Sequence, residues 1–174
     1  MNRPSLIRRL KMLRNLEFFN IFWLPICLYV ALTSRNAFQY WQPYVYGMFL
    51  ICIVLAQAVL YWHLKIQTIS KTGTAFPAFF YALFSFFKWA DLTLLFIYPL
   101  LVFGSQFSPL LNFQTSIWAN LLYLFAAIEY TNYYHYQLSH DNLNDLRYLF
   151  KYRRIRRSPL YMDLLRNQQR GRKP

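Results

Sequence analysis

Four apolar stretches, each close to the length of a membrane span, constrain this chain more than any other feature. A helix needs about 20 apolar residues to cross the hydrocarbon core of a bilayer. We expect the spans at Phe18 to Leu32, Val45 to Leu64, Phe84 to Phe103, and Ile117 to Tyr136. Of 174 residues, 57% are hydrophobic and 21% aromatic, more than a soluble domain of this size can bury. The chain is therefore predicted to be an all-α, polytopic membrane protein with four transmembrane helices.

The first apolar stretch follows basic residues, as the core of a signal peptide also does. It ends in VALTSRNAF, which has no small-x-small cleavage site. We therefore expect this stretch to be retained as a span.

The positive charges predict the direction of the spans. The connection between the first two spans holds only Arg35, and residues 104–116 hold no Lys or Arg. Both terminal segments are rich in Lys and Arg, so the positive-inside rule places both termini in the cytoplasm. This pattern favours a bacterial inner membrane, with an organellar inner membrane or a thylakoid membrane as alternatives. The predicted parts are a basic arm (1–17), a four-helix bundle (18–136) and a basic tail (137–174).

The two basic segments carry amphipathic patterns. PSLIRRLKMLRNLEFF alternates leucines with cations at helical spacing, as in a helix that lies on anionic lipid. Ser158 and Pro159 have the residue types of a helix cap and a first helical turn, so another short helix is expected there. We expect lipid headgroups or an acidic protein as the partner; nucleic acid is disfavoured because no nucleic-acid module is present. The predicted binding cations are Arg8, Arg9, Lys11, Arg14, Arg153, Arg154, Arg156 and Arg157.

Polar residues gather at one depth of the predicted bundle. By helix rise, Glu129 lies about 10 Å from the cytoplasmic boundary, and Lys88 and Asp91 lie about 6 and 10 Å deep. Gln57 lies about 10 Å deep in the second span by the same rise. Glu17, Asn20, Asn132, His63 and His135 lie nearer the boundary.

This polar layer has two interpretations. Ionisable groups inside a membrane are candidates for function, so the layer is a possible catalytic, proton-transfer or headgroup site. The alternative is a structural clasp that fixes the helices in register, with Lys88 near Glu129. The candidate catalytic residues are Glu129, Lys88, Asp91, Asn132 and His135.

The three histidines, His63, His135 and His140, all lie at the predicted cytoplasmic boundary. A haem held by His63 and His135, or a metal site of His with carboxylates, is geometrically conceivable. We nevertheless expect interfacial histidines without a metal, and no cofactor.

The sequence predicts location better than activity. We expect a non-catalytic anchor, scaffold or accessory subunit of a larger membrane complex, or a protein that self-associates. The first alternative is a lipid-binding protein or a membrane enzyme that uses the polar layer. The second is proton or ion passage through an oligomer.

Overall fold

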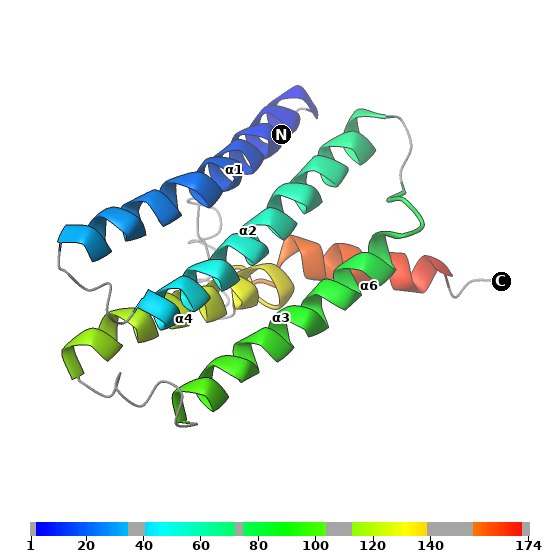
Figure 1. The fold of residues 1–174 in the computed structure, drawn as a ribbon. Helices are drawn as coiled ribbons and strands as arrows, with labels where there is room; N and C mark the ends of the chain where they lie inside the picture. Colours follow the sequence, from blue (N-terminus) through cyan, green and yellow to red (C-terminus); the bar gives the residue numbers. More distant parts are fainter. Residues whose placement is uncertain (1–2, 35–40, 72–74, 104–112, 139–154, 172–174) are drawn as a thin grey trace.

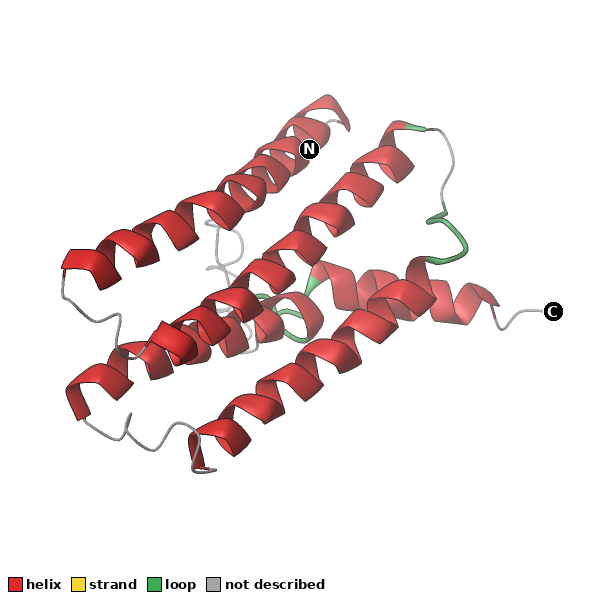
Figure 2. Ribbon diagram, in the orientation of Figure 1, coloured by secondary structure: helices red, strands yellow, loops and turns green. Residues whose placement is uncertain are grey.

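The computed structural model describes residues 3–34, 41–71, 75–103, 113–138 and 155–171. Within these ranges the chain is helical, with short connecting segments and one isolated bridge between Tyr136 and Arg157. Figure 2 shows this secondary structure. The helices are α1 (Arg3–Ser34), α2 (Trp41–Ser70), α3 (Phe80–Phe103), α4 (Phe113–Tyr134) and α6 (Pro159–Gly171).

The four long helices run up and down beside one another, and α6 lies across one end of them (Figure 1). Helix α2 is the central element, because it packs along both α1 and α4. At the end that carries α6, the start of α1 meets the end of α2. There Arg3 donates from Nε to the carbonyl of Ile69 and from Nη2 to that of Ser70, both at 3.1 Å. The N-terminus and α6 therefore share one end of the bundle; its side of the membrane stays a prediction.

The fold confirms the all-helical prediction in its coarse form. Within the described part of the chain, α1, α2 and α3 are long and apolar enough to cross a membrane. Helix α4 has 22 residues, a length of about 33 Å at the usual rise, but in the described residues it is not among the helices apolar enough to count as a span. A fourth crossing therefore stays a prediction. The basic residues at the start of the chain form no separate helix, because α1 continues through residues 17 and 18 without a break.

Two prolines inside the long apolar helices each free a backbone carbonyl group, and a side chain of a neighbouring helix contacts that carbonyl. Pro99 lacks the N–H that would bond to Leu95, and the hydroxyl of Tyr123 donates to the Leu95 carbonyl instead, at 3.1 Å. In α1, Pro25 similarly frees the carbonyl of Ile21, and the thiol of Cys52 lies 3.8 Å from it. Because lipid offers no hydrogen bonds, such contacts make the prolines tolerable in membrane helices.

Helices α2 and α4 approach closely at Gly47. A Cβ atom at this position would lie 3.1 Å from Cβ of Leu122 and 3.3 Å from the backbone nitrogen of Tyr123. Ala119 and Ala126, also buried, stand about one turn to either side of this contact on α4. Small residues at a helix crossing let backbones pack tightly, which is the main source of attraction between membrane helices.

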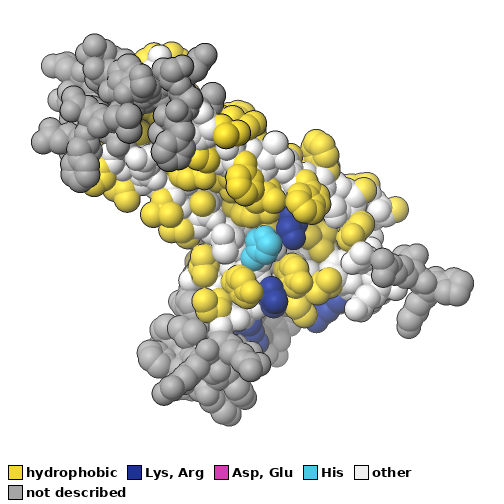
Figure 3. All heavy atoms as spheres, turned by 90° about the horizontal axis from the view of Figure 1, so that it is seen from below, with side chains coloured by type: hydrophobic (Ala, Val, Ile, Leu, Met, Phe, Trp, Pro, Cys, Tyr) yellow, Lys and Arg dark blue, Asp and Glu magenta, His cyan; other side chains and the backbone are white. Residues whose placement is uncertain are grey.

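Large apolar side chains cover the outside of the bundle. Figure 3 shows one face, on which apolar side chains dominate the described surface and Lys and Arg lie around a His. A soluble monomer rarely exposes apolar patches of this extent, whereas lipid accommodates them. Together with the three apolar helices, this surface is compatible with a membrane location. The most exposed of these side chains include Phe18, Phe22, Trp23, Phe86, Trp89, Phe96 and Leu100.

Helix α6 begins where the sequence predicted a helix start. The backbone N–H of Tyr161 donates to Oγ of Ser158 at 3.1 Å, so Ser158 caps the helix and Pro159 occupies its first turn. The Ser158 hydroxyl also donates to the carbonyl of Tyr133, which ties the cap to the end of α4. Leu160 buries its side chain against the bundle, as an amphipathic helix should.

Candidate functional site

A groove opens between α1 on one side and α4 and the start of α6 on the other, with α2 as its floor. Its volume is about 510 Å³, within the range of small-molecule sites. We call it the α1–α4 groove. Its lining residues in α1 include Leu6, Arg9, Leu13, Glu17, Asn20 and Leu24.

One end of the groove is apolar. Leu24 of α1, Leu55 of α2 and Phe125 of α4 line it. On α1, Leu24 is seven residues beyond Glu17, which is about 10 Å along the helix. In the predicted orientation this end lies deepest in the membrane, where an apolar chain is the natural occupant.

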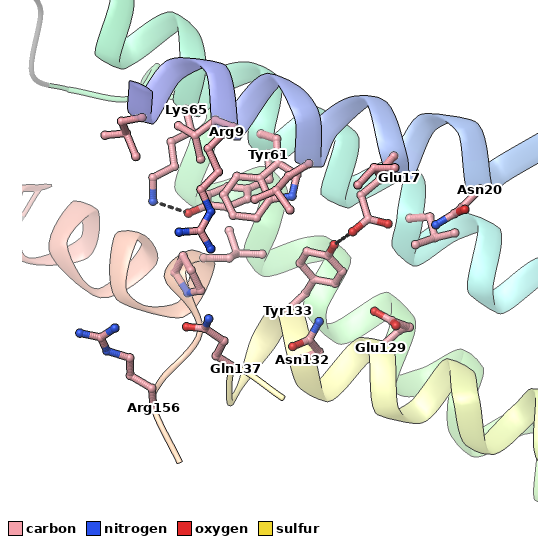
Figure 4. Close-up of a pocket in the computed structure, with 18 of the residues that line it drawn as sticks. Arg9, Glu17, Asn20, Tyr61, Lys65, Glu129, Asn132, Tyr133, Gln137 and Arg156 are labelled. Atoms are coloured by element: carbon pink, nitrogen blue, oxygen red, sulfur yellow. Dashed lines mark hydrogen bonds between the residues drawn. The ribbon is translucent and has the colours of Figure 1, made fainter. Parts of the chain in front are cut away.

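The middle of the groove is polar and carries two carboxyl groups. The hydroxyl of Tyr133 donates to Glu17 across the groove, from α4 to α1 (Figure 4). Glu129 lies on α4 beside Asn132 and interacts electrostatically with Glu17. Oδ1 of Asn132 accepts a hydrogen bond of 2.8 Å from the backbone N–H of Leu138, which holds the chain that leaves α4. The middle of the groove therefore presents hydrogen-bond acceptors to a ligand.

The other end of the groove is basic. Arg9 is half-buried and reaches from α1 into the groove, toward Gln137, as Figure 4 shows. Lys65 of α2 and Arg156, just before α6, also line this end. Arg9 precedes Glu17 by eight residues, about 12 Å along the helix. From its deep end outward, the groove thus runs from apolar through acceptor-rich to cationic.

A second polar group lies on the other side of α4, buried among α2, α3 and α4. Nε2 of Gln57 donates to Oδ1 of Asp91 at 2.9 Å, and the hydroxyl of Tyr134 donates to Oε1 of Gln57 at 2.6 Å. All three side chains are buried. We call these residues, with the adjacent Tyr130, the Asp91 network.

The structure divides the predicted polar layer between these two places. Glu129 and Asn132 face α1 in the groove, whereas Asp91 belongs to the buried network. The expected contact between Lys88 and Glu129 is not found in the described residues, where Glu129 has Glu17 and Asn132 as its neighbours. Lys88 lies close enough to His135 for the two to interact electrostatically, and two cations there would repel each other.

The predicted cations of the arms have different surroundings. Of the N-terminal four, Arg9 lines the groove, Arg8 and Lys11 are exposed, and Arg14 donates to Oδ1 of Asn15 at 2.9 Å. In the tail, Arg156 lines the groove. The guanidinium of Arg157 lies over the rings of Tyr136 and Tyr161, at 4.6 and 5.1 Å from their centres. Arg153 and Arg154 lie outside the described residues.

The histidines do not form a metal centre in the described part of the chain. There, no three His, Cys, Asp or Glu side chains gather closely enough to hold a metal ion. Nε2 of the exposed His63 lies 2.9 Å from Nε2 of Gln67, one turn along α2. His135 packs beside the ring of Tyr130, with 5.6 Å between ring centres. His140 lies outside the described residues.

Sequence reasoning missed the contact that anchors α6. Asp163 is buried, and its Oδ2 accepts from the hydroxyl of Tyr61 at 2.7 Å and from Nζ of Lys65 at 2.8 Å. Nζ of Lys65 also donates to the Tyr61 hydroxyl at 2.7 Å. A signal was present, because Asp163 lies between Leu160 and Leu164 on the apolar side of the helix. Acidic residues on such a face are seldom buried without a partner.

No protein-family model, curated protein or solved structure matches the chain. The function is therefore argued from the site alone.

Proposed function

We propose that this protein binds an anionic amphiphile, a phospholipid or a related lipid, in the α1–α4 groove. The order of the lining residues carries the proposal. An apolar end, an acceptor-rich middle and a cationic end follow one another over about 22 Å of helix α1, at 1.5 Å per residue. A lipid with a phosphate headgroup has the same order: a hydrocarbon chain, a backbone that can carry hydroxyl groups, and an anion.

Each zone has a defined role in this proposal. The side chains around Leu24, Leu55 and Phe125 hold the chain. Glu129 and Asn132 accept hydrogen bonds from hydroxyl groups of the lipid backbone or headgroup. Arg9 holds the phosphate, because a guanidinium matches the geometry of an oxyanion.

Two neighbouring arginines provide a matched test. Arg9 lines the groove, whereas Arg8 is exposed and is not among the residues that line it. Arg9→Gln and Arg8→Gln remove the same charge one residue apart. A hydrogen bond to a charged group contributes about 1.5–3 kcal/mol, so Arg9→Gln should weaken binding of a phosphate headgroup by roughly 10- to 100-fold.

The measurement is native mass spectrometry of the purified protein titrated with phosphatidylglycerol and, for comparison, phosphatidylcholine. We expect phosphatidylglycerol to bind with defined stoichiometry, Arg9→Gln to reduce that binding, and Arg8→Gln to leave it nearly unchanged. Equal losses in the two variants would show only a general attraction to anionic lipid, and the groove would not be the site.

A role as a subunit of a membrane complex is the second candidate, and the surface of α1 favours it. Only 6% of the most apolar stretch of α1 is buried within the chain. Phe18, Phe22 and Trp23 point outward from this helix, so they are open to a second membrane protein as well as to lipid.

Replacing these three by leucine keeps the surface apolar but changes its shape. A subunit that purifies with the wild type in mild detergent, at fixed stoichiometry, and is lost from the triple variant would support this role. A variant that keeps the subunit would count against it, and so would the absence of any such subunit from both the wild type and the variant.

A further inference from the structure

The Asp91 network contains a carboxyl group that the proposed function does not use. Only 2% of Asp91 is exposed, and among the described residues its side chain makes one hydrogen bond, which Oδ1 accepts from Gln57. The second oxygen, Oδ2, has no hydrogen-bond partner in the described structure. The hydroxyl of Tyr130, 5% exposed, also has none, and it interacts electrostatically with Asp91.

The groups that face Asp91 are neutral. From α2 it meets the amide of Gln57, and from α4 the hydroxyl groups of Tyr130 and Tyr134. On its own helix Lys88 lies one turn away, and among the described residues it makes no ion pair with Asp91. On α6, which contacts α3, Asp163 is paired with Lys65 of α2, and the exposed Arg166 approaches Asp163, so neither is paired with Asp91 in the described structure.

An ionised carboxylate in these surroundings would be costly. Charged side chains near the centre of a membrane helix cost about 2.5–3.5 kcal/mol even by the mildest scale. One hydrogen bond from an amide offsets part of this cost, whereas a stable buried carboxylate usually needs a cation or several donors. A neutral carboxylic acid avoids the cost and supplies a donor for an acceptor nearby.

We propose that Asp91 is a proton-binding site inside the helix bundle: the proton is carried on Oδ2, the oxygen that accepts no hydrogen bond in the described structure. The hydrogen bonds of the network then run in one direction, from Tyr134 through Gln57 to Oδ1 of Asp91, and end at a neutral carboxylic acid. The ligand of this site is the proton itself, and the site is independent of the α1–α4 groove.

This assignment sets the sign of a pH effect. A folded state that holds a proton more tightly than the unfolded state is stabilised where the proton is bound. That stability is lost as the pH rises and the proton leaves, because the bundle must then bury a charge. Asp91→Asn imitates the protonated acid, since its amide keeps an acceptor for Gln57 and carries no charge.

The test compares thermal unfolding in detergent from neutral to alkaline pH. We expect the wild-type melting temperature to fall as the pH rises. At neutral pH, the melting temperature of Asp91→Asn should lie within about 3 °C of the wild type, since a change of 1 kcal/mol in stability shifts the melting temperature by about 2–4 °C. The same carboxyl-to-amide change in the groove, Glu129→Gln, should leave the alkaline fall in place. If Asp91→Asn unfolds far below the wild type, or keeps the full alkaline fall, the proposal is wrong.

Infrared spectroscopy tests the proton directly, and it needs no stable Asp91 variant. In the Glu17→Gln and Glu129→Gln double variant, we expect a carbonyl band of a protonated carboxylic acid at neutral pH. Gln57→Leu should shift this band, because Oδ1 of Asp91 then loses its hydrogen bond from Gln57. Absence of a protonated-acid band at neutral pH would overturn the assignment.

Discussion

Asp163→Ala should release α6 from the bundle. The side chain of Asp163 is 10% exposed, and it accepts hydrogen bonds from Tyr61 and Lys65. Its removal leaves the ammonium group of Lys65 beside α6 without its carboxylate.

The expected cost follows from the burial of the pair. Removing one partner of a buried ion pair costs about 3–5 kcal/mol. The side chain of Lys65 is 22% exposed and can regain some water, so the lower limit applies here, about 3 kcal/mol. At 1.4 kcal/mol for each factor of ten, docking of α6 should weaken by roughly 100-fold.

Hydrogen exchange of the amide groups of α6 measures this opening. We expect protection in the interior of α6 to fall by about two orders of magnitude in Asp163→Ala, while α2 keeps its protection. Arg166→Gln is the control. Arg166 approaches the same carboxylate only to 3.9 Å and is 71% exposed, so this change should cost a few tenths of a kcal/mol at most.

A double variant separates charge from packing. Asp163→Asn with Lys65→Met removes both charges and keeps similar side-chain volumes, so it should protect α6 better than Asp163→Ala does. If Asp163→Ala leaves the exchange of α6 unchanged, the buried pair does not hold this helix, and the reasoning from burial fails.

Two further changes test how the spans pack. Gly47→Ala should lower the melting temperature, because the new Cβ would meet Leu122 and force α2 and α4 apart, at a cost of about 1–3 kcal/mol. A variant as stable as the wild type would refute the close approach of the two helices. Tyr123→Phe should lower the free energy of unfolding by about 1 kcal/mol in the wild type, because the hydrogen bond to the Leu95 carbonyl is lost. In the Pro99→Ala background the same change should cost much less, since alanine restores the backbone N–H that bonds to Leu95. A double-mutant cycle without coupling would show that Tyr123 does not compensate for the proline.

The helices could be predicted from sequence because their causes are local. The apolar stretches indicate the long helices, and Ser158 with Pro159 indicates the start of α6. The position of each polar residue along its helix axis also follows from helix rise. This position does not, however, say toward which neighbouring helix a side chain points.

The rotation of each helix could not be predicted in this way. Glu129 and Tyr130 lie at nearly the same depth, but a rotation of about 100° per residue puts Glu129 in the groove and Tyr130 in the Asp91 network. The sequence therefore suggested one polar layer where the fold has two sites. Rotation depends on packing, and Gly47, which sets the contact of α2 with α4, shows its effect only when its neighbours are known.

Contacts between distant segments were also beyond the sequence. Asp163 and Lys65 are 98 residues apart, and their pairing follows from the docking of α6 on α2. The continuity of α1 was missed for a different reason. The change from cations to aromatics near residue 17 resembles a boundary, whereas a helix passes through it without interruption because no residue there breaks the backbone hydrogen bonding.

Photo-crosslinking tests most directly whether the α1–α4 groove is the lipid site. An anionic lipid with a photoreactive group near the end of one acyl chain is bound in detergent and irradiated, and the labelled peptides are identified by mass spectrometry. We expect labels at Leu24, Leu55 and Phe125, at the apolar end of the groove, and their loss in Arg9→Gln but not in Arg8→Gln. Labels confined to the outer face of α1, at Phe18, Phe22 and Trp23, would contradict the account.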